Sequence, residues 1–179
     1  NRVNHLEIEL DEACNQVIAK RQPTAVDLRM ISTVQKTITD LERIGDEAKK
    51  IAKTAKQLHT TGSNFTPQIR LAHIATAVVD MLRTSLDAYA RLDTISAAQV
   101  VRQDKEVDAE FKGIMRQLIT YMMEDPRTIS QSIELMFVAK SVERIGDHAK
   151  NIAEYVVYMV KGRDVSHTSL EEIEREATR

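Results

Sequence analysis

The chain has 179 residues, of which 25 are basic and 27 acidic, so it has neither a polybasic surface for nucleic acid nor an acidic tail. Its single cysteine excludes an internal disulfide and indicates a reducing compartment, the cytoplasm, and no apolar run approaches the roughly 18 residues of a membrane-spanning helix. Scarce aromatic residues, five glycines and three prolines in a chain rich in Ala, Leu, Glu, Lys and Arg predict an all-α protein.

Two helices are predicted in the first third of the chain. Apolar residues three and four apart predict a helix from residue 1 to about 20. Arg21-Gln22-Pro23 ends it, because proline disfavours a helical residue before it. Thr24 with Asp27 resembles a capping box that starts a second helix, which we expect to reach about Leu58.

A boundary between two units is predicted at residues 60–64, whose sequence Thr-Thr-Gly-Ser-Asn is typical of a flexible linker. Thr66 as the cap and Pro67 at the first helical position then predict a third helix over 67–92.

Asp93-Thr94 breaks this third helix in our interpretation. Ser96 with Gln99 resembles the next capping box, which predicts a fourth helix over about 97–123.

The last long helix is predicted between Asp125-Pro126, which ends the fourth helix, and Gly162, a suitable C-terminal cap. We expect it to span about 128–160. Residues 163–179 form a polar tail, for which we expect either a short helix or disorder.

An internal repeat organises the chain. Residues 42–52 (Glu-Arg-Ile-Gly-Asp-Glu-Ala-Lys-Lys-Ile-Ala) return at 143–153 with nine of eleven positions identical. The repeat predicts a duplicated unit, with the first copy in residues 1–61 and the second in 66–162. A helix precedes the repeated pair in the second unit and none does in the first. We therefore expect two tandem three-helix bundles, the first without its leading helix, which leaves an apolar face exposed.

Pairs of acidic residues four positions apart mark the core edge of four predicted helices. Residues at this spacing lie on one helix face, so two helices of a unit can direct four carboxylates into a shared seam. The first seam comprises Glu7, Asp11, Glu42 and Asp46, and the second seam comprises Asp104, Asp108, Glu143 and Asp147. Like charges at this spacing destabilise a helix, so something must neutralise them.

Two interpretations of the seams remain open. Basic residues could neutralise them, since Lys49 and Lys50 are within reach of Asp46, and Lys150 of Asp147. Alternatively, each set of four carboxylates could hold a metal cluster, because oxygen ligands suit hard cations such as Fe³⁺, Mn²⁺ or Mg²⁺.

Glycines also stand inside the acid pairs. Gly45 and Gly146 occupy the same repeat position, and a glycine within a helix costs about 1 kcal/mol relative to alanine. We interpret them as sites where another helix backbone approaches closely, with room for a metal cluster as the second interpretation.

The sequence gives little support for a metal site with histidine ligands or for an enzyme motif. His148 is interpreted as a surface residue, with an added metal ligand as the alternative. No histidine follows a glutamate by three positions, which excludes the ligand motif of ferritin-like di-iron bundles. Neither a glycine-rich phosphate loop nor the setting of a Ser or Cys nucleophile occurs, so the chain carries no enzyme signature.

The doubled Glu-Arg-Ile-Gly-Asp and the matching acid pairs make the chain resemble the PhoU family. The resemblance covers residues 1 to about 162 and includes Asp-Glu-Ala-Cys at 11–14, Ala-Lys-Arg-Gln-Pro at 19–23 and Tyr-Met-Met-Glu-Asp at 121–125. It implies six helices in two three-helix bundles, of which this chain lacks the first helix.

The resemblance also implies a function. PhoU-like proteins are cytoplasmic negative regulators of the phosphate-starvation (Pho) regulon and accessories of phosphate transport. They restrain the membrane histidine kinase PhoR, contact the transporter ATPase subunit PstB, reach the membrane only through such partners, and form homodimers. Some hold multinuclear clusters of iron or zinc, and manganese or magnesium would suit the same ligands. The resemblance carries that metal role onto all eight residues of the two seams.

Overall fold

The computed structural model describes residues 2–60, 65, 67–166 and 168–178, and it confirms the all-α prediction. The elements are α1 (Arg2–Arg21), α2 (Ala25–Thr60), α3 (Leu71–Arg91), α4 (Thr94–Glu124), the 3₁₀ turn η1 (Pro126–Thr128), α5 (Ile129–Lys161) and α6 (Leu170–Thr178). No strand occurs in these ranges. Within them, no helix combines the length and the apolar character needed to cross a bilayer.

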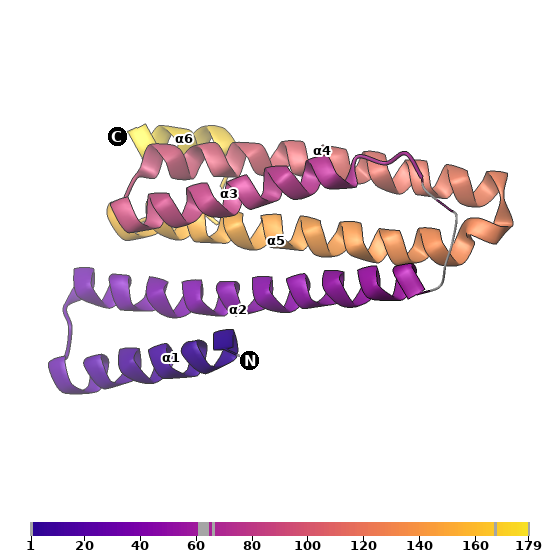
Figure 1. Cartoon of the computed structure of the whole chain (residues 1–179). Coiled ribbons are helices and arrows are strands. Elements are labelled where there is room, and N and C mark those ends of the chain that lie inside the picture. Colours follow the sequence, from indigo (N-terminus) through magenta and orange to yellow (C-terminus); the bar gives the residue numbers. More distant parts are fainter. Residues whose placement is uncertain (1, 61–64, 66, 167, 179) are drawn as a thin grey trace.

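Helices α3, α4 and α5 form one bundle with a dry core (Figure 1). The core side chains recur three and four residues apart, which places them on one face of each helix. The most deeply buried include Ile74, Val78 and Met81 of α3, Val100, Ile114 and Leu118 of α4, and Ile152, Val156 and Val157 of α5. This bundle fixes the facing surfaces of α4 and α5, on which the second seam lies.

Helix α2 lies along the outer side of α5, and α1 lies along α2 on the side away from α5 (Figure 1). Only Cys14 of α1 is buried among the described residues. Apolar side chains of α1 remain exposed, namely Val3, Leu6, Ile8, Leu10 and Val17. The first unit therefore has an apolar outer face, as the sequence predicted.

Two predicted helix starts are wrong. Helix α3 begins at Leu71 rather than at Pro67: residues 67–70 are not helical, and Pro67 and Ile69 line a groove together with apolar residues of α2 and α5. Helix α4 begins at Thr94, since Asp93 is its N-cap and accepts hydrogen bonds from the backbone N–H groups of Ile95 and Ser96. Of the linker predicted at 60–64, Thr60 is the last residue of α2, and residues 61–64 lie outside the described residues, as does the predicted cap at residue 66.

The polar C-terminal segment forms a short helix. In α6, Ile173 and Ala177 are buried against α4, and the hydroxyl of Thr94 donates a 2.8 Å hydrogen bond to the carbonyl of Ala177. Gly162 ends α5 in the left-handed conformation (φ 73°), as predicted, which lets the chain turn back toward α4.

Candidate metal centre

Three aspartates of the second seam converge between α4 and α5. One carboxylate oxygen from each of Asp104, Asp108 and Asp147 lies within 4.8 Å of the others. Asp104 and Asp108 stand one turn apart on α4, and Asp147 follows the repeat glycine on α5. In the part of the chain that the structure describes, no other three carboxylates, histidines or cysteines come this close. We refer to these three residues as the aspartate cluster.

The surroundings of the aspartate cluster disfavour the ionised form of Asp104 and Asp147. Burial and, to a lesser degree, the neighbouring charges of Glu143, Asp104 and Asp108 together raise the pKa of Asp147 from 3.8 to about 6. Burial also raises the pKa of Asp104, although Lys150 opposes this effect. A cation at the cluster would remove this penalty, because an opposite charge favours the ionised carboxylate.

Lysines neutralise part of the second seam. The ammonium of Lys150 lies 3.0 Å from Asp104 Oδ2, and Lys140 donates a 2.7 Å hydrogen bond to Glu143 Oε1. Glu143 is buried and belongs to the seam, but its carboxylate is not part of the tight cluster. The sequence placed Lys150 beside Asp147, whereas the structure pairs it with Asp104.

The first seam is arranged differently. Glu7, Asp11, Glu42 and Asp46 are all half-buried along α1 and α2. Amide side chains bind two of these acids: Asn4 donates to Glu42 at 2.8 Å, and Gln35 donates to Asp11 at 2.8 Å. Lys50, expected near Asp46, instead pairs with Glu47 at 2.9 Å. The described residues therefore show one tight carboxylate cluster, in the second seam, although the acid pairs repeat.

The repeat glycines do not admit a helix backbone, which corrects the sequence interpretation. A Cβ on Gly146 would meet side-chain atoms of Val78 at 3.4 Å, Val107 at 3.6 Å and Met81 at 3.9 Å. A Cβ on Gly45 would meet Val3 at 3.7 Å. These are ordinary van der Waals distances, and the atoms nearest to each glycine belong to side chains.

His148 is not on the surface, contrary to the sequence interpretation. It is buried between α2 and α5, where its Nδ1 lies 2.7 Å from Oδ1 of Asp40, itself 2% exposed. Asn151 adds a longer contact of 3.4 Å to the same oxygen. His148 thus joins the two units rather than the aspartate cluster. Asp40 lies outside the repeated motif and has no acidic partner four residues away, so the sequence pattern did not reveal it.

A second buried acid also links the units. Glu47 of α2 accepts contacts of 2.9 Å from both Lys50 and Arg144. Burial would raise its pKa, but hydrogen bonds from Lys50 and Ser141 and the charge of Arg144 outweigh burial and lower the pKa. Glu47 therefore stays ionised and fixes a basic residue of α5 against α2.

The PhoU domain family model matches residues 1–55 and 71–156, which places one match over α1–α2 and another over α3–α5. The chain belongs to the PhoU family. It is 46% identical over 176 residues to a phosphate-specific transport system accessory protein PhoU homolog of Pseudomonas aeruginosa, covering 98% of this chain and 73% of that protein. The corresponding PhoU of Escherichia coli is 47% identical over 174 residues, covering 97% of this chain and 71% of the relative.

Solved structures of the PhoU family share this fold. The crystal structure of PhoU from Pseudomonas aeruginosa superposes with a TM-score of 0.87 at 47% identity, covering 90% of this chain and 78% of that one. The phosphate transport system regulatory protein PhoU from Streptococcus pneumoniae gives 0.84 at 25% identity, covering 92% and 77%.

Proposed function

We propose that this chain is an accessory protein of bacterial phosphate transport and a negative regulator of the phosphate-starvation (Pho) regulon. The observation that carries the proposal is the PhoU domain match over both of its helical units. Relatives sharing nearly half of its residues bear the name phosphate-specific transport system accessory protein. It acts through contacts with the sensor kinase PhoR and the transporter ATPase PstB, as a cytoplasmic homodimer without enzymatic activity.

The aspartate cluster supports a metal site in this adaptor. Its donors are all carboxylate oxygens, which hard cations prefer, and burial, together with the neighbouring carboxylates, raises the pKa values of Asp104 and Asp147. Asp104, Asp108 and Asp147 would bind the ion, with Glu143 the nearest further carboxylate of the seam. A bound cation would neutralise the facing surfaces of α4 and α5 and hold the two helices together.

A second candidate is an adaptor whose seams hold no metal. The ion pairs of Lys150 with Asp104 and of Lys140 with Glu143 favour it, because they already place two positive charges at the seam. Lys150 would have to move aside for an ion to use both oxygens of Asp104.

Repression of a phosphate-starvation reporter tests the regulatory role. We expect the chain, expressed in an Escherichia coli strain that lacks its own PhoU relative, to restore repression in phosphate-rich medium. A reporter that stays on while the chain accumulates as folded protein would refute the proposal. Glu42→Ala tests the first seam: loss of repression in a folded variant would show that this seam contributes, and wild-type repression would show that it does not.

Elemental analysis separates the two candidates. Protein purified without chelator should contain stoichiometric metal, and Asp147→Asn should lose it. Asp87→Asn makes the same charge change on the exposed face of α3 and should keep it. Asp46→Asn reports on the first seam in the same way. Absence of metal from the wild-type protein, or metal unchanged in Asp147→Asn, would favour the salt-bridged seam.

A further inference from the structure

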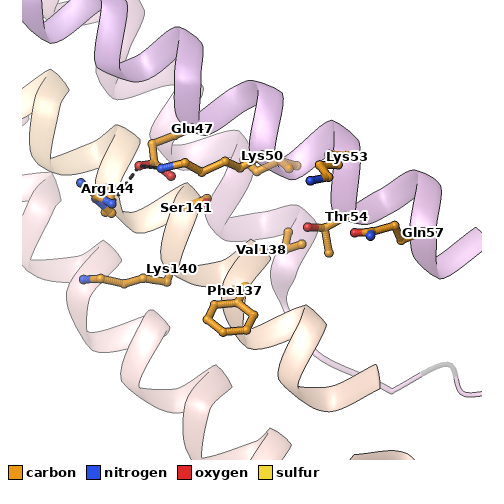
Figure 2. A pocket seen from close by; sticks show the side chains of 11 residues that line it. Glu47, Lys50, Lys53, Thr54, Gln57, Phe137, Val138, Lys140, Ser141 and Arg144 are labelled. Carbon is orange, nitrogen blue, oxygen red and sulfur yellow. Dashed lines mark hydrogen bonds and ion pairs between the residues drawn. The ribbon is translucent and has the colours of Figure 1, made fainter. Parts of the chain in front are cut away.

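A basic pocket lies between α2 and α5 (Figure 2), and none of the three residues of the aspartate cluster lines it. Its volume is about 350 Å³, within the range of small-molecule sites. The basic side chains that line it are Lys50, Lys53, Lys140 and Arg144, and its one acidic side chain is Glu47. Neighbouring pockets differ: one beside α4 combines Arg70 with Glu106 and Glu110, and the groove between the first turn of α3 and α5 has no charged lining.

Glu47 holds two basic side chains of the pocket in place but does not cancel the positive charge of the pocket. A single carboxylate oxygen of Glu47 receives both Lys50 and Arg144, each at 2.9 Å. An ammonium has three N–H donors and a guanidinium five, so both cations keep donors for a ligand. Because the pKa of Glu47 is lowered, this arrangement persists at neutral pH. Lys140 is neutralised by Glu143 outside the pocket.

The other residues that line the pocket provide an ammonium group, hydroxyl groups and an exposed aromatic ring. Lys53 lies one turn beyond Lys50, and among the described residues its ammonium forms no ion pair. Thr54 adds a hydroxyl group, and Ser141 a second one that hydrogen-bonds Glu47. Figure 2 shows Lys53 and Thr54 of α2 toward one end of the pocket and Arg144 of α5 toward the other, beside Glu47. Phe137 is 63% exposed at the rim, which is unusual for an aromatic side chain and offers a surface for stacking.

We propose that this pocket binds a phosphate group, either as inorganic phosphate or as part of a nucleotide. Cations and hydroxyls that approach from two helices match an anion with several oxygens and more than one charge better than a flat carboxylate. Lys53 and Thr54 would contact the phosphate oxygens, and Lys50 and Arg144 would add positive charge to the pocket. The floor between the helices would exclude water from one side of the anion.

Binding of inorganic phosphate and of AMP to the chelator-treated full chain tests the proposal. Titration calorimetry at low ionic strength should detect one or both. Lys53→Ala should weaken binding about tenfold, the usual effect of losing one hydrogen bond from a charged group. Lys56→Ala removes the same charge from an exposed position of α2 that does not line the pocket, and it should bind as the wild type does. Lys53 is exposed, so its substitution should not affect folding.

The results identify the source of the phosphate as well. Equal affinity for inorganic phosphate and AMP would indicate the free anion. Tighter binding of AMP, with the difference removed by Phe137→Ala, would indicate a nucleotide stacked on that ring. Binding should persist in Asp147→Asn, because the aspartate cluster is not part of the pocket. Absence of binding to both probes, equal binding by Lys53→Ala and Lys56→Ala, or loss of binding in Asp147→Asn would overturn the proposal.

Discussion

Replacing Asp147 by asparagine should stabilise the metal-free protein at neutral pH. In the folded chain its pKa is about 6, against an ordinary value of 3.8, so the folded state resists ionising this group. That difference corresponds to about 3 kcal/mol. Because Asp147 is half-buried, solvent reduces both the burial penalty and the repulsion by neighbouring carboxylates, so we lower the expected gain to roughly 1–2 kcal/mol.

The sign of the pH dependence follows from proton binding. Between pH 3.8 and about 6 the folded wild type binds a proton at Asp147 that the unfolded chain has released, so its stability falls as pH rises through this window. Asparagine does not titrate. The advantage of Asp147→Asn should therefore be complete at pH 7.5, decline as pH falls through 6, and vanish near pH 4.

Urea denaturation of the chelator-treated proteins at a series of pH values measures this effect. Asp87→Asn, on the exposed face of α3, controls for the change of net charge and should show no comparable gain. Added metal should reverse the order at pH 7.5, because a ligand that binds only the folded wild type stabilises it. Loss of stability in metal-free Asp147→Asn, or a gain that does not depend on pH, would refute the inferred cost of ionising Asp147 in the folded chain.

Three further substitutions test the described packing and charges by thermal or urea denaturation. Gly146→Ala should be neutral or stabilising by up to about 1 kcal/mol, since a Cβ meets only side chains at 3.4 Å or more, and a clear loss would contradict the spacing. His148→Ala should cost about 2–3 kcal/mol by leaving the carboxylate of Asp40 without its close partner, whereas an unchanged midpoint would show that the pair contributes nothing. Glu154→Gln should stabilise by roughly 1–2 kcal/mol at pH 8 and progressively less below pH 7, because burial raises the pKa of Glu154 to about 7; equal gains at pH 8 and pH 5 would exclude this cause.

Local signals in the sequence predicted the helices well, and the misplaced starts have local causes. Asp93 was interpreted as a helix breaker, although an aspartate that ends one helix can also cap the next. Pro67 is acceptable at a first helical position, but residues 67–70 are not helical, and Ile69 packs instead against the core of the α3–α5 bundle. Such contacts depend on residues distant in sequence, which periodicity does not report.

In the candidate sites too, some features follow from spacing along the sequence and others depend on how the helices pack. Spacing alone brought Asp104 and Asp108 together, because four residues make about one helical turn. That Asp147 completes a tight cluster, while Glu143 turns to Lys140, depends on how α4 packs on α5. The sequence did not predict the basic pocket, since Lys53 and Arg144 are 91 positions apart and line one pocket only because α2 lies along α5.

The sequence by itself determined the helical class, the duplication and which helix faces carry acid pairs, because each follows from residues within a few turns of one another. The tertiary structure alone decided that the two copies of the motif differ. In the second seam a packed bundle buries the aspartates against one another, whereas in the first seam amides bind the acids on helices that are exposed on one side. Burial and the distance between charges set their interaction, and the fold of the whole chain sets both.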